Sequence, residues 1–411
     1  MSDSYYERTT CRLCGNDSFA TLIDLGAQPP ANAFLAPETI GDEEHYPLHV
    51  VRCVDPECGF VQLKHVVDPE ILFGEYVYVS STSPVFVKHF ENYAQSMDSR
   101  LGLEGALTLD IGSNDGILVR PLKALGAQAL GVDPARAIAE RATAEGLETL
   151  VGYFTESFAK YLTARRSHAK LITANNVFAH IDDLDEIMRG VRVLLARDGL
   201  FVIEAPYLLD YLDKNLYDTT YHEHLSYLAI KPLQKFFENF GMHIVDVDHV
   251  DSHGGSARIM VAHRDSDFTE TPTVATMIRD EEKRSSELFK KFAQAVGQNK
   301  ESLTEMLGQF KQQGKKIAAY GAPAKGNTLL NFMQIGPETL DYIVDDNPLK
   351  QGLVSPGMHV PVVPSTALVS NPPDYLVILA WNFAPSIMEK NQDFAARGGK
   401  FIVPMPMPHV V

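Results

Sequence analysis

The sequence lacks any apolar run of the roughly 20 residues that a transmembrane helix needs. Its first residues contain neither the basic start nor the apolar stretch of a secretory signal peptide. Basic residues are also few, because 36 Lys and Arg face 53 Asp and Glu, a formal net charge of −17. Such an acidic chain repels phosphate backbones. We therefore expect no nucleic-acid partner, no membrane partner and a cytoplasmic location.

Cysteine is scarce, and all four residues lie within the first 58 positions. They form two short-spaced pairs, Cys11-x-x-Cys14 and Cys53-x4-Cys58, each followed by a glycine that permits a tight turn. Two such pairs suit a tetrahedral zinc ion, and disulfides are unusual in a reducing compartment. Four cysteine ligands leave no open coordination position, so we expect a structural zinc ion. A redox Cys-x-x-Cys is the alternative, without the strand-to-helix context of thioredoxin.

The chain is long enough for two or three domains, and 45% of its 411 residues are hydrophobic. A strand-like run at 107–111 leads into a turn that starts at Gly112 and ends at Gly116, and then into a helix-like stretch at 117–125. The next strand-like run ends on Asp133. A glycine turn between strand and helix, with an acidic residue ending the second strand, suits the binding of an adenosine ribose.

The residues of this turn favour S-adenosylmethionine over NAD. Asn114 stands where the dinucleotide pattern has a glycine, and a pyrophosphate needs that close approach. Asp110 and Asp115 would also repel a pyrophosphate, whereas they suit a cationic ligand. A Rossmann-like turn without any cofactor is the alternative.

Strands and helices continue to alternate, with strand-like runs at 170–174 and 199–204 and a helix-like stretch at 184–195. This alternation predicts a parallel, doubly wound sheet whose ligand lies at the carboxyl ends of the strands. Four segments at such ends are expected to converge in one cleft: 110–115, Asp133, 175–180 and 204–207.

The segment 221–224 reads Tyr-His-Glu-His and is dense in titratable groups. Histidine is the usual general base near neutral pH, a neighbouring carboxylate raises its basicity, and tyrosine can donate to an oxyanion. In an extended segment His222 and His224 would share a face without Glu223, and a third metal ligand is not evident. Acid–base catalysis is the favoured interpretation, with metal binding and packing histidines as alternatives.

The stretch from His253 to Arg258 contains two adjacent glycines after a strand-like run at 244–250. The glycines allow a close backbone approach and Arg258 could hold an anion, while a plain hairpin with a surface arginine is the alternative. Helical spacing of apolar residues over 266–313 predicts two amphipathic helices that bridge the domains.

A second strand–turn–helix unit begins near residue 316. Its turn contains Lys325 and two glycines but no carboxylate, which suits an anion such as a pyrophosphate at a helix N-terminus. The spacing from glycine to lysine differs from that of a Walker loop. Later strand-like runs end at Asp345 and at Asn382, and a run at 400–403 closes a second Rossmann-like sheet. The second unit therefore suits a phosphorylated substrate.

Over nearly its whole length the chain resembles the sugar C-methyltransferases that act on nucleotide-linked keto-deoxysugars. The resemblance rests on six motifs together: the Cys-x-x-Cys start, Leu109-Asp-Ile-Gly-Ser-Asn-Asp-Gly116, Asn175-Asn-Val-Phe-Ala-His180, Tyr221-His-Glu-His224, His253-Gly-Gly-Ser256 and Gly321-Ala-Pro-Ala-Lys-Gly326. It implies an α/β protein with a zinc-binding lobe at 1–66, a Rossmann-like S-adenosylmethionine domain at 67–265, and a helical bridge with a Rossmann-like nucleotide-sugar domain at 266–411. The second cysteine pair departs from the shorter spacing that is common in the family.

The resemblance also implies methylation of a sugar carbon beside a ketone, typically C3 of a dTDP- or GDP-linked 4-keto-6-deoxysugar. His224 would remove the proton, Glu223 would orient or polarise the cluster, and Tyr221 or His180 would stabilise the enolate oxygen. We expect the cofactor to contact Tyr76, Ser80, Asp110, Gly112, Asn114, Asp115, Gly116, Asp133, Asn175 and Asn176. We expect the substrate to contact Tyr78, Tyr207, His222, His253, Ser256, Arg258, Ala322, Lys325, Asn327, Asp345 and Asn382.

Two other functions stay open from the sequence. One is a small-molecule O- or N-methyltransferase that uses the same cofactor domain. The other is a non-enzymatic zinc-ribbon interaction module with a vestigial cofactor fold. We expect a monomer or a weak homo-oligomer.

Overall fold

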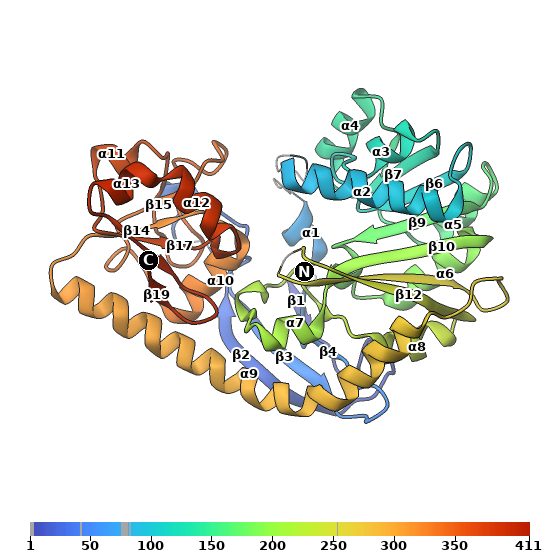
Figure 1. The fold of residues 1–411 in the computed structure, drawn as a ribbon, viewed down its shortest axis with the longest axis horizontal. Helices are drawn as coiled ribbons and strands as arrows, with labels where there is room; N and C mark the ends of the chain where they lie inside the picture. Colours follow the sequence, from blue (N-terminus) through green and yellow to red (C-terminus); the bar gives the residue numbers. More distant parts are fainter. Residues whose placement is uncertain (1–3, 42, 75–80, 82–83, 253) are drawn as a thin grey trace.

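A computed structural model describes residues 4–41, 43–74, 81, 84–252 and 254–411. Two α/β bodies lie side by side, and one long helix runs beneath both of them (Figure 1). We call the body with the chain's last third the C-terminal lobe and the other the central domain. Among the described residues, no helix is both long and apolar enough to cross a membrane.

The central domain is built on a seven-stranded sheet in the order β12-β13-β10-β9-β6-β7-β8. The five strands from β10 to β8 are parallel to one another. Strand β13 runs antiparallel to β10, and β12 runs antiparallel to β13. The predicted parallel sheet is thus confirmed for five strands and extended by an antiparallel hairpin. The strands are β6 (Leu107–Ile111), β7 (Gln128–Asp133), β8 (Thr149–Val151), β9 (Ala169–Asn175), β10 (Leu195–Pro206), β12 (Met242–Val250) and β13 (Ser256–His263).

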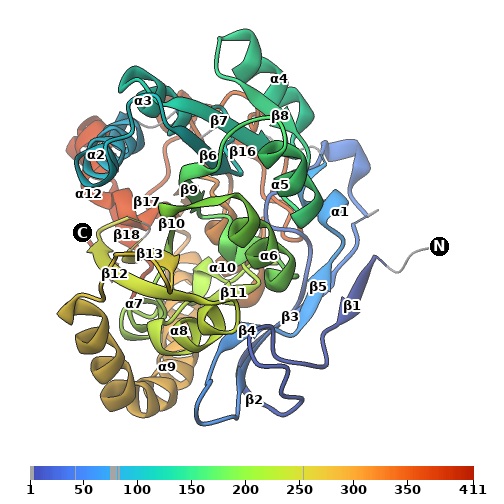
Figure 2. The same cartoon turned by 90° about the vertical axis from the view of Figure 1, so that its right-hand side faces the viewer.

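Helices pack on both faces of this sheet (Figures 1 and 2). Every residue of β6 and most residues of β9 are buried, as expected for strands that are covered on both faces. The described helices of the domain are α2 (Pro84–Leu101), α3 (Val119–Ala124), α4 (Arg136–Ala144), α5 (Glu156–Thr163), α6 (Leu184–Leu194), α7 (Leu208–Asp213) and α8 (Ile230–Glu238), with short 3-10 turns η3 (Phe178–His180) and η4 (Tyr217–Thr219).

The N-terminal part forms a curved antiparallel sheet in the order β11-β4-β3-β2. Its edge strand β11 (Ser226–Tyr227) comes from the central domain, directly after the His-rich segment, and pairs with β4. The other elements are β1 (Tyr5–Glu7), which pairs with β5 (His65–Val67), then β2 (Phe19–Gln28), η1 (Pro37–Thr39), β3 (Tyr46–Cys53), β4 (Val61–Leu63) and α1 (Pro69–Phe73).

The C-terminal lobe contains a six-stranded sheet in the order β16-β15-β14-β17-β18-β19. All its pairings are parallel except the last, in which β19 runs antiparallel to β18. Its elements are β14 (Ile317–Tyr320), α10 (Ala324–Met333), β15 (Ile343–Val344), β16 (Val362–Val363), α11 (Ala367–Ser370), β17 (Tyr375–Ile378), η5 (Trp381–Phe383), α12 (Ala384–Lys390), α13 (Gln392–Ala396), β18 (Lys400–Val403) and β19 (His409–Val410). The second Rossmann-like unit is therefore confirmed.

The bridge between the lobes is one helix, α9 (Pro272–Gln312), and the expectation of two helices is wrong. No proline follows the first position of this segment, and an isolated glycine such as Gly297 costs only about 1 kcal/mol within a helix. Two buried polar residues, Glu281 and Asn299, lie on α9. Eighteen residues, or five helical turns, separate them, so they share one face.

Candidate active site

The glycine turn after β6 has the backbone conformation that its sequence predicts. Gly112 and Gly116 have φ angles of 66° and 81°, and Asn114 has 50°. Asp133, at the end of β7, accepts the backbone N–H of Asn114 and that of Ala135, both at 2.8 Å, one on each carboxylate oxygen. Each oxygen retains a lone pair, which suits the two hydroxyls of a ribose.

Two further carboxyls make this end of the sheet suited to a cation. Asp110 is buried and accepts hydrogen bonds from Thr173 at 2.6 Å and Asn175 at 3.2 Å, while burial raises its pKa to about 7. Asp115 accepts from Ser81 through Oδ2, and its buried Oδ1 has no hydrogen-bond partner in the described part of the chain. A buried acceptor without a donor fits a ligand with an ammonium or hydroxyl group. These residues therefore fit S-adenosylmethionine.

The segments expected to converge do so. Asn175 contacts Asp110, and the backbone N–H of Asn176 bonds the carbonyl of Glu204 at 2.7 Å. These segments therefore lie together at the carboxyl ends of the parallel strands. Four expected contact residues, Tyr76, Tyr78, Ser80 and His253, lie outside the described residues.

His224 lies between Tyr221 and His180, with ring centroids 3.9 Å and 5.0 Å away. Its Nδ1 lies 2.7 Å from the carbonyl oxygen of Thr219. A carbonyl only accepts, so Nδ1 carries the proton and the lone pair of the neutral ring is on Nε2. The hydrogen bond therefore favours the tautomer in which Nε2 can accept a proton.

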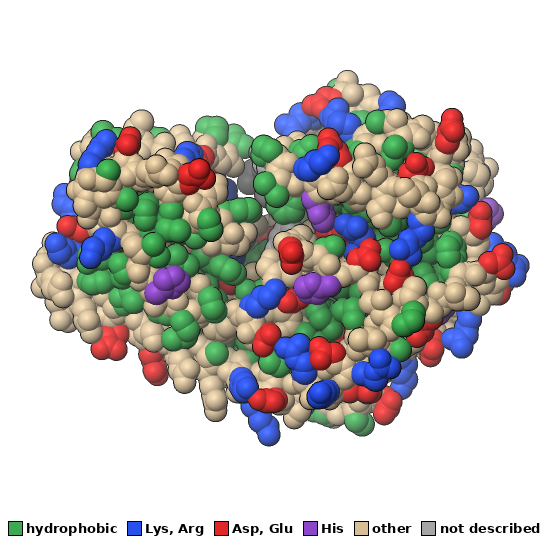
Figure 3. Space-filling view, in the orientation of Figure 1, with side chains coloured by type: hydrophobic (Ala, Val, Ile, Leu, Met, Phe, Trp, Pro, Cys, Tyr) green, Lys and Arg blue, Asp and Glu red, His purple; other side chains and the backbone are tan. Residues whose placement is uncertain are grey.

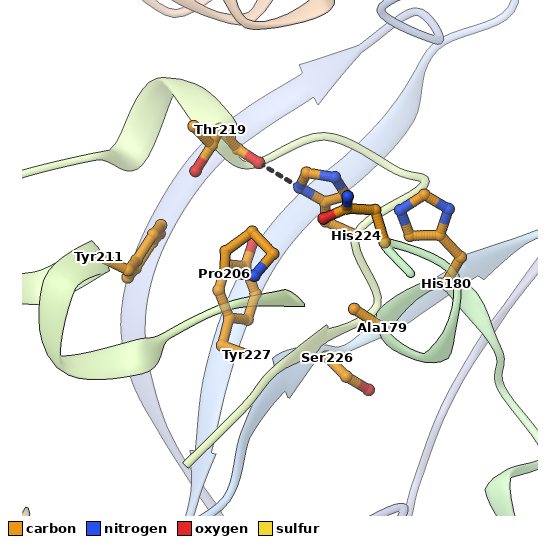
Figure 4. Close-up of a pocket in the computed structure, with 9 residues that line it drawn as sticks. Ala179, His180, Pro206, Tyr211, Thr219, His224, Ser226 and Tyr227 are labelled. Carbon is orange, nitrogen blue, oxygen red and sulfur yellow. Dashed lines mark hydrogen bonds between the residues drawn. The ribbon is translucent and has the colours of Figure 1, made fainter. Parts of the chain in front are cut away.

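A small cavity of about 20 Å³ lies beside this ring. The close-up shows the rings of His224 and His180 next to each other at one end of it and Tyr211 at the other (Figure 4). Its lining residues are Asn176, Ala179, His180, Pro206, Tyr211, Thr219, His224, Ser226 and Tyr227. The space-filling view also shows a depression between the central domain and the C-terminal lobe (Figure 3).

Glu223 is buried, and burial raises the pKa of its carboxyl to about 7. Its Oε1 accepts a hydrogen bond of 2.7 Å from Asn32, which follows β2. Sequence analysis did not identify Asn32, because it lies in a loop without a motif. The loop after β2 thus contacts the segment 221–224 directly.

The segment 221–224 forms a turn, closed by a 2.8 Å hydrogen bond from the N–H of His224 to the carbonyl of Tyr221. The expectation that His222 and His224 share a face in an extended chain is therefore wrong. His222 is buried against Tyr46, whose carbonyl lies 3.0 Å from its Nε2. Burial lowers the pKa of His222 to about 4, so this ring stays neutral near pH 7.

Several expected substrate residues make contacts within the protein. The hydroxyl of Tyr207 donates to Glu281 on α9 at 2.9 Å. Arg258 binds Glu204 through two nitrogens at 2.8 Å and stacks on Tyr93. Ser256, fully buried, donates to the carbonyl of Ser252.

In the C-terminal lobe, Asp345 accepts the N–H of Ala322 at 2.6 Å, as Asp133 accepts that of Asn114. Lys325 donates to Asn382 and lies 4.4 Å from the ring centroid of Trp381. Asn327 is buried and donates to the carbonyl of Ala31 at 2.7 Å.

Sequence analysis also missed Lys350, which has no motif around it. Its Nζ donates to the carbonyl of Ala322 at 2.7 Å and lies over the ring of Phe34. Burial lowers its pKa. Lys350 and Lys325 thus both flank the second glycine turn.

The four cysteines converge as their spacing predicts. Their sulfurs all lie within 4.8 Å of one another, with Cys11 and Cys58 3.7 Å apart and Cys14 and Cys53 3.6 Å apart. A tetrahedron with zinc–sulfur bonds of about 2.3 Å has edges of about 3.8 Å. All four are free thiols, and Gly15 and Gly59 have the predicted positive φ. The residues fit a zinc ion.

Three family models match successive parts of the chain. They are described as "Putative zinc binding domain" at 11–73, "Methyltransferase domain" at 91–247 and "C-methyltransferase C-terminal domain" at 251–406. C-methyltransferase NovU of Streptomyces niveus is 36% identical over 416 residues, which cover 100% of this chain and 99% of that protein. The chain belongs to this C-methyltransferase family.

This C-methyltransferase is therefore an enzyme that transfers a methyl group from S-adenosylmethionine to carbon, with a zinc-binding site of four cysteines. Membership in the family excludes the non-enzymatic alternative. A ubiquinone biosynthesis O-methyltransferase of Azorhizobium caulinodans is 28% identical, over 29% of this chain and 47% of that protein. Among solved structures, the PH0226 protein of Pyrococcus horikoshii OT3 matches with a TM-score of 0.38 at 14% identity, over 45% of this chain and 94% of that one.

Proposed function

We propose that this C-methyltransferase methylates a nucleotide-linked 4-keto-6-deoxysugar at C3. The observation that carries the proposal is the hydrogen bond between Nδ1 of His224 and the carbonyl of Thr219. It gives the ring the tautomer that a base needs, at the carboxyl edge of the sheet where the cofactor turn lies. A carbon beside a ketone is acidic enough for such a base.

The reaction proceeds by enolate formation. Nε2 of His224 takes the proton from C3, and the electron pair of the broken C–H bond moves into the enolate. Tyr221 or His180 stabilises the enolate oxygen with a hydrogen bond. When bound, S-adenosylmethionine supplies an electrophilic methyl group on sulfur. The enolate carbon would take up this methyl group, and the electron pair of the broken S–CH3 bond would stay on sulfur.

Two features support a nucleotide diphosphate as the handle of the substrate. Lys325 lies in the first turn of α10, and Lys350 donates to the carbonyl of Ala322, just before that helix begins. A helix N-terminus with two lysines suits a diphosphate. We propose a dTDP- or GDP-linked sugar. The similarity to C-methyltransferase NovU supports carbon as the atom that receives the methyl group.

The proposal is tested by incubating the protein with S-adenosylmethionine and a panel of dTDP- and GDP-linked 4-keto-6-deoxysugars. Mass spectrometry should detect one added methyl group in the sugar portion, on carbon. Without the cofactor, the protein should exchange the proton at C3 with deuterated solvent. His224→Gln should lose both activities, while the exposed His168→Gln serves as the matched control. No exchange with any sugar, or exchange undiminished in His224→Gln, would contradict the proposal.

A further inference from the structure

The short turn η4 contacts the imidazole of His224 through its last residue. The carbonyl of Thr219, the last residue of η4, accepts the hydrogen bond from Nδ1. The direction of this carbonyl therefore contributes to the orientation of the ring and to its tautomer. Tyr217, Asp218 and Thr220, which surround Thr219 in the sequence, are all at most 1% exposed.

The bridge helix and the end of the C-terminal lobe hold the first residue of η4. The hydroxyl of Tyr217 donates to Oδ1 of Asn299 on α9 at 2.6 Å. The amide nitrogen of Asn299 in turn donates to the carbonyls of Pro404 and Pro406, at 2.8 and 2.9 Å. Asn299 is fully buried, so these bonds form in a medium of low dielectric, where they are strong.

Two more residues of the C-terminal lobe hold the neighbouring positions. The indole N–H of Trp381 donates to Oδ2 of Asp218 at 2.6 Å. The hydroxyl of Thr328 on α10 donates to the carbonyl of Thr220 at 3.0 Å. The first two residues of η4 and the residue after it are thus tied to α9 and the C-terminal lobe, outside the methyltransferase domain.

We propose that Asn299, Trp381 and Thr328 are positioning residues for the base. They fix η4 so that the carbonyl of Thr219 keeps the proton of His224 on Nδ1. The inference rests on the proposed role of His224 and extends it, because it gives the C-terminal lobe a part in the chemical step. Lys325 lies against the indole of Trp381, and the same indole donates its N–H to Asp218. A substrate phosphate bound at Lys325 would therefore be connected to η4 through Trp381.

Two conservative variants remove one donor each without touching Lys325. Thr328→Val removes the hydroxyl that binds the carbonyl of Thr220, and Tyr217→Phe removes the hydroxyl that binds Asn299. Tyr342→Phe is the matched control, because its hydroxyl donates to the carbonyl of Asn371 within the C-terminal lobe, away from η4. Nitrogen-15 NMR of the histidine rings, with His224 assigned from His224→Gln, reports the tautomer without any substrate.

In the wild type and in Tyr342→Phe the ring of His224 should carry its proton on Nδ1. In Thr328→Val and Tyr217→Phe, the Nδ1-protonated and Nε2-protonated forms of His224 should both be populated. Solvent deuterium exchange into the sugar should fall about tenfold or more, since small displacements of a catalytic group cost about that much. The dissociation constants of sugar and cofactor should stay within about twofold.

An unchanged tautomer signal in both variants would overturn the inference, whatever the substrate proves to be. Unchanged exchange in both variants, with exchange lost in His224→Gln, would overturn it while leaving the proposed function intact. If His224→Gln itself keeps exchange, the proposed function fails, and the NMR result alone decides whether the C-terminal lobe positions this ring.

Discussion

At the scale of single residues, burial controls the charge of the acidic groups near the cleft. It raises the pKa values of Asp110 and Glu223 to about 7. For Glu204 burial acts in the same direction, but hydrogen bonds from His89 and Arg258 outweigh it and lower the pKa. Two of these carboxyls therefore titrate near neutral pH, while the third stays ionised.

Glu223→Gln should stabilise the protein at alkaline pH. The carboxyl has a pKa of about 7 when folded, against 4.5 for the free side chain, so ionisation above pH 7 costs folding free energy. Wild-type stability should fall as pH rises from about 4.5 to 7. The glutamine can still accept the hydrogen bond of Asn32. We expect a gain of about 1 to 3 kcal/mol at pH 8 and a smaller one at pH 5, measured by denaturant unfolding.

The exposed Glu57→Gln is the control for this prediction and should change stability equally little at both pH values. A gain from Glu223→Gln that is the same at pH 5 and pH 8 would show that the carboxyl does not have a raised pKa.

Gly112→Ala should destabilise the protein and weaken cofactor binding. The φ angle of 66° disfavours an L-residue, and a Cβ would lie 2.3 Å from Cγ2 of Val177. We expect a loss of about 2 to 4 kcal/mol and at least tenfold weaker binding of S-adenosylmethionine by calorimetry. Gly102→Ala has a similar φ and open space around it, so it should cost only about 1 kcal/mol and leave the affinity unchanged.

At the scale of elements, α9 supplies the cap that α8 lacks. The N-cap position of α8 is Ala229, which has no side-chain acceptor. Glu281 on α9 instead accepts the N–H groups of Ile230 and Lys231, at 2.6 and 2.9 Å. A carboxylate at a helix N-terminus is stabilising because the exposed N–H groups carry partial positive charge. This contact ties the bridge helix to the central domain.

Glu281→Gln should lower the free energy of unfolding by about 1 to 3 kcal/mol. One of its two oxygens becomes an NH₂ group, which faces a backbone N–H where an acceptor is needed. The neighbouring Glu282→Gln removes only an exposed ion pair with Lys231 and should cost less than about 0.5 kcal/mol. Equal midpoints for the two variants in urea would argue against the capping role.

The elements show what sequence patterns can and cannot predict. Buried apolar runs such as 107–111 predicted the strands of the central sheet, since the pattern is local. The pairing of Ser226 and Tyr227 with β4 depends on two residues and a contact distant in sequence, for which no pattern exists. The hydrogen bond from Asn32 to Glu223 also joins residues that are distant in sequence, and no pattern predicts it. The spacing of the four cysteines, in contrast, predicted that their sulfurs lie together.

At the scale of the whole molecule, the zinc loop (residues 11–14) contacts the segment that follows His180. Arg12, between the first two cysteines, is buried and binds Asp182 at 2.9 Å, two residues beyond His180. It also donates to the carbonyl of Leu63 at 2.8 Å. The shape of the zinc loop therefore supports the segment that contains His180.

Removing zinc with a chelator should loosen this segment. We expect faster amide hydrogen exchange at 178–183 and reduced methyl transfer, while S-adenosylmethionine still binds, because the cofactor turn lies on a separate sheet. Asp182→Asn should reproduce the faster exchange with zinc present. Unchanged protection at 178–183 after complete metal loss would rule out this connection.

The edge strand β11 has a consequence for biosynthesis. While the ribosome is still making the middle of the chain, β4 has a partner on one side only, and its other edge is exposed. The sheet gains its last strand when Tyr227 has emerged, in the same stretch that delivers His224. Nascent chains that stall before this point would present an open β-edge to chaperones or to one another.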